Sequence, residues 1–149
     1  MTDPDVKFDV NTELAARRTG MAFQRTRLAE DRTLMAVIRT ALSLIGFGFT
    51  IFQFFQTLRE KDIITKAAAP RHFGLSLVGL GVLMLILGIA YHARFMLGLR
   101  RLRRSMSEEG LIHGETVFPV SLTMITAFLL LAIGLTAIVS MEFQIGPFG

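Results

Sequence analysis

The sequence predicts an all-α membrane protein with three transmembrane helices, the first of which extends into the cytoplasm. Its composition supports this class, because 52% of the 149 residues are hydrophobic and only 19% are charged. The charges are also segregated, and three runs contain no Asp, Glu, Lys or Arg: residues 40–55, 73–91 and 117–141. About 20 apolar residues in a helix cross the ~30 Å hydrocarbon layer of a bilayer. A soluble bundle would need a polar face on each helix, and the second and third runs have none.

The polar N-terminal segment precedes the first apolar run. Residues 1–12 are acidic and show no apolar periodicity, so we expect a disordered tail. A helix then opens at Glu13, and no proline interrupts the chain up to Phe55. We therefore expect one helix to run from the cytoplasm into the bilayer, with a membrane part at about 34–55 that includes Arg39.

Two further helices complete the predicted transmembrane domain, residues 13–143. We expect the second at about 73–93, and the sequence beyond it still favours a helix that continues past the bilayer. Pro119 suits the first turn of a third helix at about 117–141, where its missing N–H has no partner to lose. Residues 144–149 are then an external tail.

Small residues are frequent in the apolar runs. They could mark close helix contacts, or they could reflect the general abundance of glycine in transmembrane helices. The residues concerned are Gly46, Gly48, Gly74, Ser76, Gly79, Gly81 and Gly88.

Lysine and arginine counts in the flanking segments predict the orientation of the chain. Six of these residues lie in the N-terminal segment, before the membrane part at about 34–55, and five lie between the second and third runs. Four lie between the first and second runs, and none follows the third. Because the more positive side faces the cytoplasm, the N-terminus is expected inside and the C-terminus outside.

The most informative feature is a seven-residue repeat in the N-terminal helix. Its basic members, which we call the arginine stripe, are Arg18, Arg25, Arg32 and Arg39. An apolar stripe lies four residues before each of them: Leu14, Met21, Leu28 and Met35, followed by Leu42. An alanine stripe comes directly after the apolar one: Ala15, Ala22, Ala29 and Ala36. Seven residues are nearly two turns, so each stripe drifts by only ~20° per step. This period indicates helix packing, with a basic ridge beside the packing surface.

Arg39 lies about five residues inside the first membrane segment, ~7.5 Å along the helix axis. A buried arginine costs about 2.5–3.5 kcal/mol at the centre of a bilayer and less near its surface. Its side chain could extend to the inner lipid headgroups. Alternatively, it could face a protein-lined or watery cavity and bind an anion.

A second basic cluster follows the second apolar run. It consists of His92, Arg94, Arg100, Arg101, Arg103 and Arg104. Orientation and contact with anionic lipid would suffice to explain it. The functional alternative is a basic mouth for phosphate-like ligands, because arginine binds phosphate in a bidentate manner. On that hypothesis the anion-binding residues are Arg25, Arg32, Arg39, His92, Arg94 and Arg101.

The stretch AEDRTLMAVIRTALSLIGFGF resembles the signature of the YidH-like bacterial inner-membrane proteins, a family of unknown function (domain of unknown function 202). The same resemblance extends to the small membrane subunit of the yeast vacuolar transporter chaperone complex, which makes and translocates polyphosphate. Asp31, Arg32 and Thr33 are similar to a Glu-Arg-Thr of that subunit, with Asp in place of Glu. Tyr91, His92 and Arg94 are similar to its Tyr-His-x-Arg. The resemblance implies a bacterial plasma-membrane location and an oligomer whose basic residues, Arg32 and Arg94 among them, line a pore for polyanions.

No pattern indicates catalysis, so we do not expect an enzyme or a cofactor. The sequence has no cysteine and no glycine-rich phosphate loop, and His113 and Glu115 are the only histidine and carboxylate within two residues of each other. The net charge of +4 comes from arginines that flank membrane segments, so nucleic acid is not an expected partner.

Two functions therefore remain. The first is an oligomeric membrane subunit with an arginine-lined cytoplasmic mouth that binds or conducts phosphate-rich anions such as polyphosphate. The second is a structural or assembly subunit that packs with other membrane proteins and contacts anionic lipid. Both functions require membrane lipids as partners and a homo-oligomer or a larger membrane complex.

Overall fold

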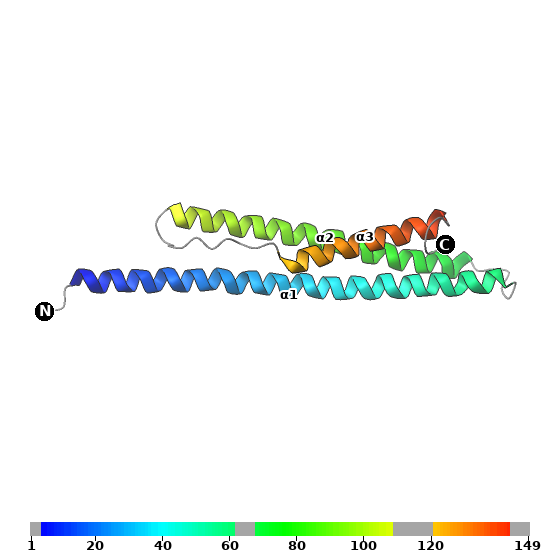
Figure 1. Ribbon diagram of the computed structural model, residues 1–149, viewed down its shortest axis with the longest axis horizontal. Helices are drawn as coiled ribbons and strands as arrows, with labels where there is room; N and C mark the ends of the chain where they lie inside the picture. The colour runs from blue at the N-terminus through cyan, green and yellow to red at the C-terminus, as the bar shows by residue number, and fades with distance from the viewer. Residues whose placement is uncertain (1–3, 62–67, 109–120, 144–149) are drawn as a thin grey trace. The chain divides into compact units, whose positions relative to one another are not determined.

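The computed structural model describes residues 4–61, 68–108 and 121–143, and the expected all-α class is confirmed. Helix α1 spans Pro4–Glu60, α2 spans Ala68–Glu108 and α3 spans Leu122–Phe143 (Figure 1). Each contains a stretch that is long and apolar enough to cross a membrane. No strand occurs within the described ranges.

Helix α1 is a single helix of 57 residues, and it includes the whole segment from Glu13 to Phe55 that the sequence predicts to be continuous. It also begins earlier than expected, at Pro4, inside the segment for which the sequence predicts a disordered tail. Proline is compatible with the first turn of a helix, because its fixed φ is helical and the missing N–H has no partner there. Gly20 does not break the helix.

Helix α2 covers the expected segment 73–93 and continues to Glu108. Helix α3 begins at Leu122, where the carbonyl oxygen of Ser121 accepts hydrogen bonds from the backbone N–H groups of Met124 (3.0 Å) and Ile125 (3.3 Å). Pro119 and the predicted tail 144–149 lie outside the described residues.

The chain forms two compact units, and helices α1 and α2 contribute to both. Unit 1 consists of Met1–Arg32 and Tyr91–Pro119, and unit 2 of Thr33–Ala90 and Val120–Gly149. The apolar cluster of unit 1 is small: Phe23 and Leu99 are buried, and Phe95, Met96 and Met106 pack against them.

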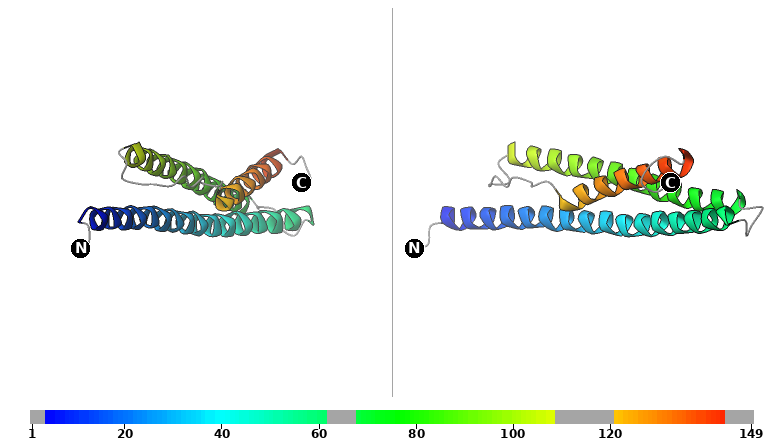
Figure 2. Two further views of the ribbon diagram at one scale, coloured as in Figure 1. Left: turned by 60° about the vertical axis from the view of Figure 1, so that its left-hand side comes forward. Right: turned by 45° about the vertical axis from the view of Figure 1, so that its right-hand side comes forward.

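Unit 2 contains the main core, to which all three helices contribute. Its buried residues include Leu34, Ala41 and Ile45 of α1, Val78, Val82 and Leu85 of α2, and Ala127 and Met141 of α3. Figure 2 shows α3 beside the other two helices of this unit, and a Cβ placed on Gly134 would lie 2.8 Å from Val82 and 3.1 Å from Ile45. The outer surface of the unit is also apolar, with Phe47, Leu87, Leu129 and Ile133 exposed. A surface of this kind suits contact with lipid.

Glycines allow the backbones of α1 and α2 to approach each other in unit 2. A Cβ on Gly48 would lie 2.6 Å from the carbonyl oxygen of Gly74, and one on Gly74 would lie 2.7 Å from that of Gly48. Gly81 and Gly88 are similarly close to side chains of α1. Gly46 and Gly79 face open space. Close helix contact therefore explains Gly48, Gly74, Gly81 and Gly88, whereas Gly46 and Gly79 fit the general abundance of glycine in transmembrane helices.

Arg71 connects the three helices at one end of unit 2. Its Nη2 atom donates a hydrogen bond to the carbonyl oxygen of Met141 (3.3 Å), and its guanidinium lies 5.3 Å from the ring centroid of Phe52. The carbonyl belongs to the last turn of α3, where a cation is favoured by the helix dipole and by acceptors that lack an intrahelical donor.

Candidate anion-binding surface

Three of the four members of the arginine stripe lie on the outside of α1 in unit 1. Arg18, Arg25 and Arg32 are exposed. Phe23, which packs toward Leu99 of α2, lies about 160° around the helix from Arg25. The stripe therefore faces away from the cluster that holds the two helices of this unit together.

No described residue offers an ion pair or hydrogen bond to the guanidinium groups of this stripe. Neighbouring arginines differ, because Arg17 Nε lies 2.7 Å from Glu13 Oε1 on the preceding turn. The guanidinium groups of the stripe therefore remain available for bidentate hydrogen bonds to an external anion.

The part of α2 in unit 1 exposes a second group of arginines. Arg94, Arg100 and Arg101 are exposed, and the described residues give them no ion-pair partner. Arg104 Nε lies 3.3 Å from Glu108 Oε1, and Arg103 is half-buried with a contact of its own. Arg25, Arg32, Arg94 and Arg101 thus all lie on the exterior of unit 1.

His92 has a different environment from the arginines with which the sequence grouped it. Its side chain is only 3% exposed, and Nε2 lies 3.6 Å from Oδ1 of Asp31 on α1. Its Nδ1 atom is buried and has no hydrogen-bond partner among the described residues. His92 therefore joins α1 and α2 inside unit 1 and does not form part of the exposed basic surface.

Arg39 belongs to unit 2, where it is exposed and therefore faces away from the core of its own unit. Its backbone carbonyl accepts a hydrogen bond from the Ser43 hydroxyl (3.0 Å). An exposed cation within an apolar segment must be solvated by headgroups, water or another protein surface.

Sequence reasoning missed a polar stripe that continues from Arg39 along α1. Its members are Ser43, Thr50, Gln53 and Thr57. Together with Gly46 they follow Arg39 at alternating intervals of four and three residues, so all lie within about 40° of it around the helix. The spacing of four and three could have revealed this stripe in the sequence.

The polar stripe lies on the outer surface of unit 2. Thr50 and Thr57 are exposed, and their hydroxyls donate hydrogen bonds to the carbonyls of Gly46 (2.8 Å) and Gln53 (3.0 Å). An open groove of about 550 Å³ runs along this surface and is lined by Thr50, Gln53, Thr57 and Lys61, with Phe49, Phe54 and Leu58. The groove therefore combines hydroxyl, amide and ammonium groups with aromatic and aliphatic side chains.

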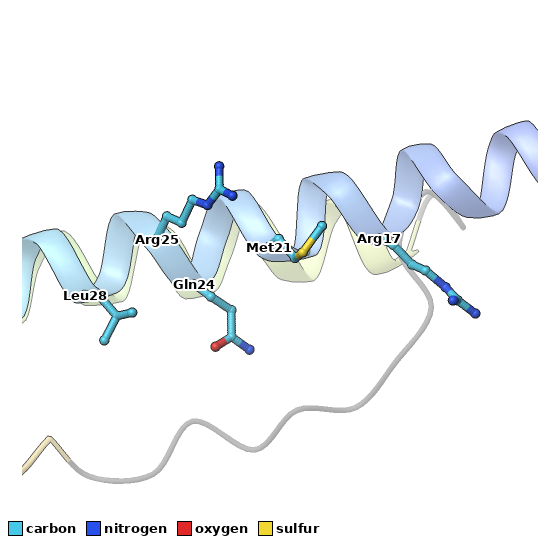
Figure 3. A pocket seen from close by; sticks show the side chains of 6 residues that line it. Arg17, Met21, Gln24, Arg25 and Leu28 are labelled. Carbon is cyan, nitrogen blue, oxygen red and sulfur yellow. The ribbon is translucent and has the colours of Figure 1, made fainter.

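A second open groove, of about 520 Å³, lies beside the arginine stripe in unit 1 (Figure 3). Its described lining consists of Arg17, Gly20, Met21, Gln24, Arg25 and Leu28. The groove therefore combines two arginines and a glutamine with Met21 and Leu28 of the apolar stripe. Among the residues that the structure describes, no group of His, Cys, Asp and Glu could hold a metal ion.

Three long apolar helices, apolar outward surfaces in unit 2 and an exposed basic surface in unit 1 define a multi-pass membrane protein. The chain belongs to the DUF202 family, a domain of unknown function, whose family model matches residues 25–103, just over half of the chain. The matched segment includes Arg25, Arg32, Arg39, His92 and Arg94. No curated protein and no solved structure matches the chain.

Proposed function

We propose that the protein is an oligomeric membrane subunit whose exposed arginines bind phosphate-rich anions at a cytoplasmic mouth. The observation that carries this proposal is the arginine stripe, whose guanidinium groups repeat along one face of α1 without an ion-pair partner among the described residues. Successive groups are ~10.5 Å apart along the helix axis. A polyanion can contact several such groups at once, whereas a single small anion cannot.

Arg39 and the polar stripe extend the proposal from binding to conduction. Both lie on the surface of unit 2 that faces away from its own core. A charged group is expensive in lipid, so a contact with the same surface of other copies would explain its exposure within an apolar segment. Such copies would enclose a path lined by arginine, hydroxyl and amide groups. We propose that phosphate-rich anions use this path.

The location follows from the same proposal. The positive charge in the N-terminal segment and after the second apolar run favours a cytoplasmic N-terminus and an external C-terminus. The resemblance to YidH-like proteins supports the bacterial plasma membrane, and that to the yeast polyphosphate-translocating complex supports a polyanion as ligand. Family likeness of this kind is an analogy, because DUF202 itself has no assigned activity.

The proposal is tested by calorimetry with short inorganic polyphosphate on the purified full chain at two salt concentrations. Arg32→Lys is expected to weaken binding by about tenfold, or ~1.4 kcal/mol, because lysine cannot form the bidentate contact. Arg17→Lys should have little effect, since Arg17 already pairs with Glu13. Affinity should fall with salt, because ionic contacts are screened.

The second candidate, a structural subunit that contacts anionic lipid, is favoured by the exposed Arg100 and Arg101 at the end of α2. It predicts binding to vesicles with anionic phospholipid and none to polyphosphate. Absence of polyphosphate binding at low salt, or equal effects of Arg32→Lys and Arg17→Lys, would therefore favour this candidate.

A further inference from the structure

Helix α1 has two apolar sides in unit 1, and α2 covers only one of them. Phe23 packs toward Leu99, whereas Leu14, Met21 and Leu28 are between 46% and 57% exposed. The apolar stripe lies about 160° around the helix from Phe23. Lipid tails cannot cover it as part of a membrane span, because the same stretch of helix carries Glu13, Glu30, Asp31 and the arginines.

The alanine stripe provides a surface of complementary shape on the same helix. Ala15, Ala22 and Ala29 are exposed and lie about 100° from the apolar stripe. Alanine side chains leave a shallow strip onto which larger side chains can pack closely. Both stripes repeat every seven residues over the same segment. The three large side chains of the apolar stripe on one helix can therefore pack on the three alanines of another.

We propose that a second copy of this chain covers the apolar stripe of unit 1. The two α1 helices lie parallel and in register, with Leu14, Met21 and Leu28 of one copy on the alanine stripe of the next. Membrane insertion supports this arrangement, because every copy enters the bilayer in the same direction and at the same depth. This inference rests on the oligomer of the proposed function and identifies its contact outside the bilayer.

The contact joins two different surfaces, so each copy has one surface free for the next neighbour. Head-to-tail contacts of this type close into rings when the rotation allows, whereas a two-fold pair would bury identical surfaces. Arg18 and Arg25 lie between the two stripes, about 40° from the apolar one. The arrangement brings arginines of neighbouring copies close together, and a bound polyanion would offset their repulsion.

The open groove of Figure 3 fits this contact. It runs beside Met21 and Leu28, and a Cβ on Gly20 would meet nothing within 4 Å. The described part of the chain therefore leaves space next to the apolar stripe for side chains of another helix.

Cysteine cross-linking of the full chain in bilayer vesicles tests the inference, since the native sequence contains no cysteine. The variant Met21→Cys with Ala22→Cys should form a ladder of dimers and larger species on mild oxidation. Each single variant should form several times less product, because identical stripes do not meet. The matched control is Thr26→Cys with Ala22→Cys, which retains one cysteine and moves the other to an exposed position about 140° around the helix from the apolar stripe and outside the groove of Figure 3.

Each outcome separates the inference from the proposed function. A dimer formed by Met21→Cys alone, or equal products from test and control, would overturn the head-to-tail contact. An oligomer seen by light scattering without the ladder would overturn the inference and leave the proposed oligomer standing. A ladder in a protein that does not bind polyphosphate would support the inference and reject the proposed function.

Discussion

The pair formed by Asp31 and His92 is the least expected feature at the scale of single residues. The sequence placed His92 with the arginines because of its position in the basic cluster, yet its side chain is buried against α1. Sequence patterns cannot separate these outcomes, since histidine occurs both in cores and on surfaces. The buried position of His92 depends on the Asp31 carboxylate, which lies 3.6 Å from its Nε2 atom and comes from a residue 61 positions earlier in the chain (92 − 31).

This pair gives a prediction about the stability of unit 1. Asp31→Asn and His92→Gln should each lower the free energy of unfolding. The double variant should lower it by less than the sum of the two single effects. The expected coupling is at least ~0.5 kcal/mol, as is usual for residues in direct contact. A double-mutant cycle on thermal unfolding in one detergent measures it, and additive effects would show that the two side chains do not interact.

Helices are the scale at which the sequence was most informative. The charge-free runs and the missing prolines were sufficient to predict three helices and the unbroken α1 from Glu13 to Phe55. Capping was less predictable, because a helix start depends on local hydrogen bonds such as those accepted by Ser121. The polar stripe was missed because its members are uncharged and do not interrupt an apolar run.

The contact between α1 and α2 gives a prediction at this scale. Gly74→Ala should lower the midpoint of thermal unfolding, because its Cβ would lie 2.7 Å from the carbonyl oxygen of Gly48 and 3.0 Å from the N atom of Phe52. Overpacking of this kind typically costs about 1–3 kcal/mol. Gly79→Ala is the matched control on the same helix, since its Cβ would meet nothing within 4 Å. Similar midpoints for the two variants would contradict the close approach of the helices.

The whole molecule presents two surfaces of different chemistry. Unit 2 exposes large apolar side chains, which suit lipid, and unit 1 exposes arginines, which suit anions, beside its own apolar stripe. The sequence predicted this division from charge segregation alone. It could not predict which way Arg39 points, because that depends on the side of α1 that α2 and α3 cover.

Arg39 therefore gives the most direct test of the account, through the reactivity of Arg39→Cys in vesicles toward a membrane-impermeant thiol reagent. A thiol reacts as the thiolate, which requires water. If Arg39 faces a water-filled path for anions, Arg39→Cys should react at a rate comparable with Arg25→Cys, and short polyphosphate should slow it. Leu87→Cys is the lipid-facing control, since Leu87 is exposed and adjacent to Gly88, which contacts Val37 of α1. An Arg39→Cys variant as unreactive as Leu87→Cys would contradict the account.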